Sequence, residues 1–297
     1  IRDMANYQRD LRRLNWYRAE SQIAKAYYYS ELVKMYGKVP IVEYAPGGYP
    51  GSGDLQRSSY DDVVDYIVRL IDSNWRKLQD DWRTEEGMAN QTGLFDQSVA
   101  LAMKSRVLLY AASPLNNPSN DASKWQAAAR AAHDLITLNN YTLPENRDYR
   151  GLFTGNNPVQ SPEVIFAVRR PDNNAMELNN YPISTPGGRS GVTPSHNLAS
   201  VYEYTGTPDP DNPYANRDPR LNASIVVNGS RWNGREIDQA PGGTDDMNKN
   251  NVSRTGYYLK KFLTDELNLV QGAQTQHQWI VFRYAEIFLN YAEAMNE

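Results

Sequence analysis

The sequence of this 297-residue chain changes in character after Tyr141. Up to that residue, apolar side chains recur at the spacing of an α-helix. From Pro171 to about Asn251 the chain is instead dense in Gly, Pro, Asn and Asp. Because a structureless segment of this length is uncommon inside a compact domain, the pattern predicts a helical scaffold that carries an elaborated, loop-rich surface. Surface loops of this kind commonly hold binding residues.

The segments that are predicted to be helical are residues 9–36, 60–79, 97–112, 123–139 and 279–297. The second has the clearest apolar stripe, and Ser58 or Ser59 suits its N-cap. The third and fourth are rich in Ala, which permits the close packing of a tetratricopeptide-like helical hairpin, although the chain has no strict tandem repeat. Arg283 and Glu286 lie one turn apart in the last segment, so an intrahelical or buried structural pair is expected.

The region after Tyr141 contains a few short candidate strands. These are residues 163–169, 221–227 and 256–262, and a short helix is expected at 199–204. The predicted fold class is therefore mainly α, with a tetratricopeptide-like hairpin scaffold, a long loop-rich region and a few short strands.

Composition excludes several classes of protein. The net charge is −4, from 31 basic and 35 acidic residues that are spread along the chain, so nucleic acid is not an expected partner. The chain has no Cys, which excludes disulfides, thiolate nucleophiles and Cys-ligated zinc. No apolar run approaches the roughly 18 residues of a membrane-spanning helix.

The polar motifs do not indicate a metal site or a catalytic centre. The clusters at 209–212 and 245–248 offer oxygen ligands for calcium, but they lack the EF-hand spacing, so solvated turns are expected there. The turn at 217–220 (Arg-Asp-Pro-Arg) is expected to pair its Asp and Arg internally. His133, His196 and His277 are far apart in the sequence and lie in no catalytic motif. We therefore expect neither a metal nor a cofactor.

Several separated motifs occur together in this chain. The most specific are residues 217–221 (Arg-Asp-Pro-Arg-Leu), 255–262 (Thr-Gly-Tyr-Tyr-Leu-Lys-Lys-Phe) and 283–294 (Arg-Tyr-Ala-Glu-Ile-Phe-Leu-Asn-Tyr-Ala-Glu-Ala). Residues 36–42 (Tyr-Gly-Lys-Val-Pro-Ile-Val) and the Ala-rich hairpin that begins at 102–114 add to them. In order and spacing, these segments resemble the SusD/RagB family of outer-membrane glycan-binding lipoproteins of Bacteroidetes.

The resemblance covers nearly the whole chain. It implies one SusD-like domain over residues 1–297, truncated at both ends, with a helical part at 1–150, a loop-rich ligand face at 151–278 and a returning helix at 279–297. It also implies a cell-surface protein, not an enzyme, that captures an oligosaccharide or polysaccharide for import by a TonB-dependent, SusC-like transporter. Its only membrane attachment would be a lipid anchor at the outer membrane, which is absent from this chain. The alternatives are a peptide-binding or protein-interaction module of the same transporter complex, and a glycoside hydrolase.

Aromatic side chains in loops are the candidate sugar-binding groups, because no helical stripe accounts for them. Such rings cover the apolar CH face of a pyranose, while Asn, Asp, Gln and Arg bind its hydroxyls. The candidate ligand-binding residues are Tyr44, Tyr49, Trp82, Asn180, Tyr181, Arg189, Tyr214 and Trp232. A framework role is the alternative for each ring, above all for Trp232, which follows a predicted strand. Three rings and a few hydrogen bonds at roughly 1 kcal/mol each predict an affinity between about millimolar and micromolar.

Overall fold

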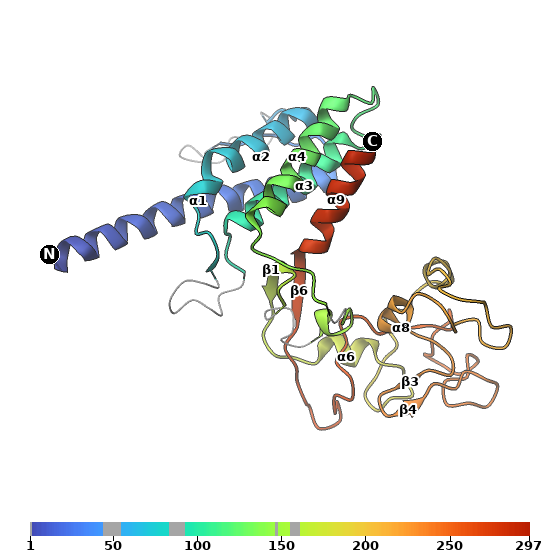
Figure 1. Ribbon diagram of the computed structural model, residues 1–297. Coiled ribbons are helices and arrows are strands. Elements are labelled where there is room, and N and C mark those ends of the chain that lie inside the picture. The colour runs from blue at the N-terminus through green and yellow to red at the C-terminus, as the bar shows by residue number, and fades with distance from the viewer. Residues whose placement is uncertain (1, 44–54, 83–92, 146–147, 155–160) are drawn as a thin grey trace. The chain divides into compact units, whose positions relative to one another are not determined.

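The computed structural model of the chain describes residues 2–43, 55–82, 93–145, 148–154 and 161–297 (Figure 1). The chain divides into two compact units. Unit 1 comprises Ile1–Leu143, Pro162–Ala167 and Val281–Glu297, and unit 2 comprises Pro144–Ser161 and Val168–Ile280.

The described part of unit 1 is mainly helical. Its helices are α1 (Arg2–Tyr36), α2 (Tyr60–Asn74), α3 (Gln97–Ala112), α4 (Ala122–Leu138) and α9 (Tyr284–Asn296), with a 3-10 helix at Trp75–Lys77. Helix α1 packs on α2, α3 packs on α4, and α4 packs on α9 (Figure 1). The predicted mainly α class and the helical hairpin of α3 and α4 are therefore confirmed.

Side chains at the helix ends account for where these helices begin and end. Ser59 accepts a hydrogen bond from the backbone N–H of Asp62, and the Asp62 carboxylate accepts one from Ser59, so the predicted N-cap of α2 is a capping box. The Asp96 carboxylate caps α3 by accepting the N–H of Val99 at 2.9 Å. Helix α4 ends at Asn139, which adopts the left-handed conformation with a φ of 55°.

The core of unit 1 surrounds α3. This helix is buried on nearly all sides, because its sequence is apolar or small around the whole helix. Ile23 of α1, Ile67 of α2 and Leu101 of α3 are at most 1% exposed and belong to one cluster. Truncating a buried aliphatic side chain to Ala costs about 2–5 kcal/mol, so this cluster stabilises the packing of the helices.

Arg283 and Glu286 do not pair with each other, so that prediction was wrong. Arg283 is the last residue of strand β6 (Gln278–Arg283), and it donates to the Glu163 carboxylate at 2.7 Å. Glu286 accepts two hydrogen bonds of 2.6 Å from Arg106 of α3. Both are structural ion pairs, but each joins segments that are distant in the sequence.

Unit 2 has little regular structure within its described residues. Its elements are a 3-10 helix at Gly151–Phe153, α6 (Ala175–Asn180), α7 (His196–Ser200), α8 (Arg220–Ser224), β2 (Ile225–Val226), β3 (Arg231–Trp232), β4 (Arg235–Glu236) and β5 (Tyr258–Leu259). Strand β2 pairs antiparallel with β5, and β3 pairs antiparallel with β4. Strand β1 (Val164–Arg169), at the predicted position, pairs with β6, and both strands contribute residues to both units.

Two predicted strands are shorter than expected. Most of segment 221–227 is helix α8, because the Asp218 carboxylate accepts the backbone N–H of Arg220 at 2.8 Å and so stabilises the start of a helix. The same carboxylate forms the predicted internal ion pair with the Arg220 guanidinium. Segment 256–262 contains only the short strand β5, and Phe262, with a φ of 70°, does not continue it.

Other elements also differ from the sequence predictions. The short helix expected at 199–204 is instead α7, at His196–Ser200. The last helix begins at Tyr284 and not at residue 279, because the preceding Trp-Ile-Val-Phe run pairs as strand β6, and a short apolar run fits either structure. The hairpin of β3 and β4 was not predicted, although its two-residue turn is Asn233-Gly234. Both turn residues have positive φ, 50° and 76°, as a tight hairpin turn requires.

Candidate ligand-binding site

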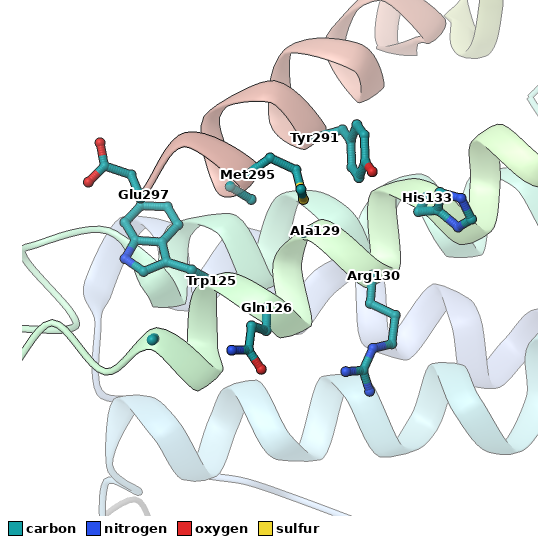
Figure 2. A pocket seen from close by; sticks show the side chains of 10 residues that line it. Trp125, Gln126, Ala129, Arg130, His133, Tyr291, Met295 and Glu297 are labelled. Atoms are coloured by element: carbon teal, nitrogen blue, oxygen red, sulfur yellow. The ribbon is translucent and has the colours of Figure 1, made fainter.

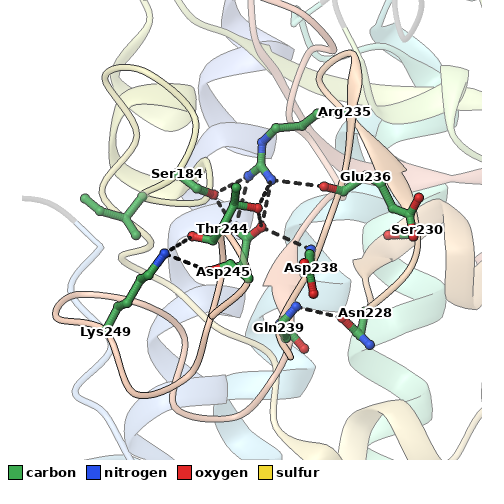
Figure 3. Close-up of polar contacts among 12 residues, drawn as sticks. Ser184, Asn228, Ser230, Arg235, Glu236, Asp238, Gln239, Thr244, Asp245 and Lys249 are labelled. Atoms are coloured by element: carbon green, nitrogen blue, oxygen red, sulfur yellow. Dashed lines mark hydrogen bonds and ion pairs between the residues drawn. The ribbon is translucent and has the colours of Figure 1, made fainter. Parts of the chain in front are cut away.

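A buried ion pair between Arg235 and Asp245 fixes loops of unit 2 (Figure 3). The Asp245 side chain is fully buried, and its carboxylate accepts hydrogen bonds from Arg235 at 2.7 and 3.0 Å. The hydroxyls of Ser184 and Thr244 also donate to it. Burial acts to raise the pKa of Asp245, but the hydrogen bonds from Arg235 and Ser184 outweigh burial and hold the pKa below its usual value. The prediction of a solvated turn at 245–248 was therefore wrong for Asp245.

The ion pair orders the backbone that leads to Asn228. The backbone N–H of Asp238 donates to the Asp245 carboxylate at 3.3 Å, and the N–H of Asp245 donates to the Asp238 carbonyl at 2.7 Å. The next residue, Gln239, donates its backbone N–H to the side-chain oxygen of Asn228 at 2.9 Å (Figure 3). This chain of contacts links the buried pair to the turn that carries Asn228.

Arg217 holds the loop that carries Tyr214. Its guanidinium donates to the carbonyl of Pro213 at 3.1 Å and to the carbonyl of Tyr202 at 2.7 Å. The same group lies 4.1 Å from the centre of the Tyr204 ring. Because Arg217 joins both sides of this loop, Tyr214 has a defined position although it lies in no helix or strand.

Tyr214 is half-buried and packs on an apolar cluster that includes Leu221, Ile225 and Tyr257. Its ring meets that of Tyr257 edge to face, with centroids 6.2 Å apart and planes at 85°. Burial, followed by the hydrogen bond with Tyr257, raises the pKa of Tyr214 to about 12. The hydroxyl is therefore neutral at physiological pH, and the contacts with Tyr257 fix the orientation of the ring.

A cavity of about 580 Å³ lies beside Tyr214. Its apolar lining includes Tyr214 and Ile225. The polar side chains that line it are Asp211, Asn212, Asn222, Asn228, Ser230, Arg231 and Lys260. Within the described residues, the side chains of Asp211, Asn222 and Arg231 have no hydrogen-bond or ion-pair partner. All three are exposed, so they are available to a ligand.

Lys260 forms part of the cavity wall directly after strand β5. Its backbone N–H donates to the carbonyl of Ser224 at 3.0 Å, and its ammonium lies 5.4 Å from the centre of the Trp232 ring. Burial lowers the pKa of Lys260 below its ordinary value, and the positive charge of Arg150 lowers it further. Lys260 is thus a partly dehydrated cation, and hydrogen bonds are stronger in such surroundings than in water.

The lining of this cavity suits a ligand with many hydroxyl groups. Tyr214 offers an aromatic surface, and the amide, guanidinium, ammonium and carboxylate groups around it pair with hydroxyls as donors and acceptors. The described part of the chain groups no three His, Asp or Glu side chains as a metal site. Asp211 is the one carboxylate among the described residues that line the cavity, whereas hydrolysis of a glycosidic bond ordinarily uses two. The lining therefore supports binding of a hydroxyl-rich ligand.

The predicted site residues of the first half of the chain are Tyr44, Tyr49 and Trp82. Tyr44 and Tyr49 lie outside the described residues. Trp82 belongs to unit 1 and is 5% exposed, and its indole N–H donates to the carbonyl of Phe95 at 3.1 Å. In this conformation Trp82 is a framework ring, and its contact with a ligand stays a prediction.

Tyr181 and Trp232 lie together in the interior of unit 2. They are 0% and 2% exposed, and their rings meet at right angles with centroids 6.0 Å apart. The Tyr181 hydroxyl donates to the carbonyl of Thr264, and burial raises the pKa of this hydroxyl. The structure therefore places both rings in the hydrophobic core of unit 2, and ligand contact by either ring stays a prediction.

Asn180 and Arg189 hold the loops beside this core. The Asn180 side chain accepts the N–H of Val192 at 3.0 Å and donates to the carbonyl of Met176 at 2.8 Å. Arg189 is exposed and donates to Asn179 at 3.4 Å. Their ligand roles also stay predictions. Of the eight candidates, the structure brings Tyr214 to the cavity described above.

Asn222, Arg231 and Lys260 line the cavity but were not among the candidates. Lys260 belongs to the motif at 255–262, which was the available signal for it. Asn222 lies on α8, directly before β2, and Arg231 lies on β3. Their neighbours in space depend on the pairing of β2 with β5 and of β3 with β4, which the sequence alone does not reveal.

Unit 1 contains a second cavity, of about 500 Å³, between α4 and α9 (Figure 2). Trp125, Arg130 and His133 line it from α4, and Tyr291 and Met295 line it from α9. The rings of His133 and Tyr291 have their centroids 5.9 Å apart. Grooves between packed helices commonly bind peptide segments, so this cavity is the observation that favours a protein-interaction role.

Comparisons with known proteins identify the fold. Residues 162–297 match the model of the SusD family. No curated protein matches the sequence of the chain. The structure is similar to a SusD-like carbohydrate-binding protein from Bacteroides fragilis, with a TM-score of 0.74 and 24% identity over 93% of this chain and 54% of that one.

Two other solved structures are similar. One is a further SusD-like protein from Bacteroides fragilis, with a TM-score of 0.74 and 24% identity over 95% of this chain and 58% of that one. The other is surface glycan-binding protein A from Bacteroides uniformis, with a TM-score of 0.67 and 16% identity over 95% of this chain and 55% of that one. The chain therefore spans little more than half the length of these proteins. The resemblance to the SusD/RagB family and the SusD-like fold class are confirmed.

Proposed function

We propose that this protein, whose fold is SusD-like and whose residues 162–297 match the SusD family, binds a glycan at the cavity beside Tyr214. The cavity combines the ring of Tyr214 with the unpaired polar side chains of Asp211, Asn222 and Arg231 among the described residues. This combination matches the two surfaces of a pyranose, one apolar and one rich in hydroxyls. It is the observation that carries the proposal.

The same lining supports a binding protein that is not an enzyme. A glycosidase uses two carboxyl groups placed about 5–9.5 Å apart across the scissile bond. Asp211 is the one carboxylate among the described cavity residues, and it has no ion-pair partner among them. If the protein hydrolysed its ligand, reducing sugar would accumulate during prolonged incubation, and we expect none.

The proposal extends to the place of this protein in the cell. The SusD family implies an outer-membrane protein at the cell surface, held by a lipid anchor, that passes its glycan to a SusC-like, TonB-dependent transporter. The family also implies that residues 1–297 belong to one domain. No helix within the described ranges has the length and apolar content to cross a membrane. Copurification of a transporter with the full-length protein from detergent-solubilised outer membranes tests the partnership.

Binding is tested first on a glycan array. Each polysaccharide that binds the protein on the array is then tested by affinity electrophoresis in a gel that contains it. We expect retention of the wild type and loss of retention in Tyr214→Ala. Tyr17→Ala is the matched control, because Tyr17 lies on α1 in unit 1 and its side chain is 60% exposed. If no glycan of a broad array retains the wild type, the proposed ligand class is wrong.

The cavity between α4 and α9 favours a second function, the binding of a peptide or a partner protein. Tyr291→Ala removes a ring from its lining without changing the cavity of unit 2. If the second function holds, this variant loses copurification of the transporter and keeps glycan retention. Equal copurification with wild type and variant contradicts a role for this groove.

A further inference from the structure

Trp279 differs from the other tryptophans of the chain. All six lie within the described residues, and Trp279 is the one that is mostly exposed, at 55%. It lies on β6, in the part of this strand that belongs to unit 2. The other five tryptophans are buried or half-buried.

The Trp279 ring is supported on one face. It stacks on Phe262 with centroids 5.1 Å apart and planes at 17°. Phe262 in turn meets Phe153 edge to face at 5.2 Å, and Phe153 meets Tyr149 edge to face at 5.0 Å. Because Phe262 covers one face of the indole, the exposed area belongs to the opposite face and the edge. The ring is thus the outer layer of an aromatic cluster that belongs wholly to unit 2.

The residues beneath the ring hold it in place. Phe262 has a φ of 70°, a conformation that a bulky side chain adopts only when its surroundings impose it. Arg150 supplies this constraint, since its guanidinium donates to the carbonyls of Lys260 at 2.9 Å and Leu263 at 2.7 Å, on both sides of Phe262. Arg150 therefore holds the backbone on both sides of Phe262, whose ring lies against Trp279.

Lys261 fixes the cluster from another side. Its ammonium lies 4.1 Å from the centre of the Phe153 ring and donates to the Tyr149 hydroxyl at 3.1 Å. The supporting layer is thus held by both aromatic and charged contacts. A rigid ring loses little conformational entropy when a ligand stacks on it.

We propose that the open face of Trp279 is a second carbohydrate-binding site, which stacks on the CH face of one pyranose ring of a polysaccharide. The ligand class rests on the proposed function, whereas the site is separate from the Tyr214 cavity. An indole face attracts the polarised C–H bonds of a pyranose and leaves its hydroxyls in water. With one face of the indole against Phe262, the ring offers a flat surface, which suits stacking on a pyranose better than insertion into a partner's pocket.

One segment contributes to both sites. Lys260 lines the cavity beside Tyr214, and the next two residues, Lys261 and Phe262, form the layer beneath Trp279. A long polysaccharide therefore has two independent contacts with unit 2, and a second contact raises the apparent affinity without any change at the first. A disaccharide occupies only one site at a time.

The test compares Trp279→Ala and Trp279→Phe with the wild-type full-length protein. We expect Trp279→Ala to weaken retention by a polysaccharide gel about tenfold, as loss of a stacking ring predicts. Its affinity for a disaccharide that binds the Tyr214 cavity should stay unchanged. Trp279→Phe, which keeps an aromatic face, should retain most of the binding. Val201→Ala, which truncates a side chain of unit 2 that is 68% exposed, is the control.

A fluorescence measurement avoids any dependence on the folding of Trp279→Ala. Saturating polysaccharide should reduce acrylamide quenching of the wild type, and it should not do so in Trp279→Phe. Equal polysaccharide binding by wild type and Trp279→Ala, with binding still lost in Tyr214→Ala, overturns this inference and leaves the proposed function intact. Protection of Trp279 by a copurified protein without glycan would also overturn it. If the wild type binds no glycan, the proposed function is wrong. The assignment of a carbohydrate ligand to Trp279 is then wrong as well.

Discussion

The variant Asp245→Asn removes the negative charge of the ion pair at the centre of the unit 2 loops. The Asp245 side chain is fully buried, whereas the Arg235 side chain keeps 25% of its surface exposed. The substitution preserves the size of the side chain and leaves an oxygen to accept from Ser184 or Thr244. The main effect is therefore the loss of charge opposite Arg235.

Leaving one member of a buried ion pair without its partner costs about 3–5 kcal/mol. Because Arg235 is partly exposed and recovers some hydration, we expect the lower end, about 3 kcal/mol. With a urea dependence of about 2 kcal/mol per molar, the midpoint of unit 2 unfolding should fall by about 1.5 M. Both residues of the ion pair belong to unit 2, so we expect the effect at the backbone amides of this unit.

Hydrogen exchange in increasing urea measures this effect on unit 2 directly. The backbone amides of Ile237 and Asp245 are suitable probes, since both donate within the loops that the ion pair holds. Asp211→Asn is the matched control, because the Asp211 side chain is exposed and has no partner among the described residues. The urea midpoint of this variant should differ from that of the wild type by at most about 0.3 M. If Asp245→Asn and Asp211→Asn unfold at the same midpoint, the buried ion pair does not stabilise these loops as argued.

Three further predictions concern stability. Arg106→Gln should destabilise unit 1 by about 2 kcal/mol, because Arg106 donates two hydrogen bonds of 2.6 Å to the Glu286 carboxylate. A double-mutant cycle with Glu286→Gln should show coupling between the two residues, and additive effects would contradict a stabilising ion pair. The folded-state pKa of Asp245 is lowered, so the ionised carboxylate stabilises the folded state above the unfolded pKa of about 3.9, and this stabilisation is lost as pH falls. Acid should therefore lower the free energy of unfolding of the wild type more steeply than that of Asp245→Asn. Gly234→Ala should cost about 1 kcal/mol, measured by thermal unfolding, because Gly234 has a φ of 76°; an unchanged melting temperature would contradict this.

The helices of unit 1 were predictable because their signals are local. The capping box of Ser59 and Asp62, and the Ala-rich sequence of α3, lie within a few residues of the structure that they specify. Strand β6 was missed because Trp279 and its neighbours form a short apolar run that fits a helix or a strand, and only pairing with β1 decides between them.

The candidate site was predictable only in part. Tyr214 was identified because it is an aromatic residue in a polar loop, and the same reasoning selected Tyr181, which is buried. Whether such a ring is buried or lies at a cavity depends on contacts with distant residues. The Tyr181 hydroxyl, for example, donates to the carbonyl of Thr264, 83 positions later in the chain. Lys260 and Asn222 meet at one cavity through strand pairing, which no local pattern encodes.

The central claim is that the Tyr214 ring binds a pyranose in the cavity of unit 2. Isothermal titration of the wild type, Tyr214→Phe and Tyr214→Ala with the same oligosaccharide tests it most directly. Phe keeps the ring and loses the hydroxyl that bonds to Tyr257, so we expect an affinity within about threefold of the wild type. Ala removes the ring, and we expect about a tenfold loss of affinity. Equal affinity for wild type and Tyr214→Ala would contradict the account.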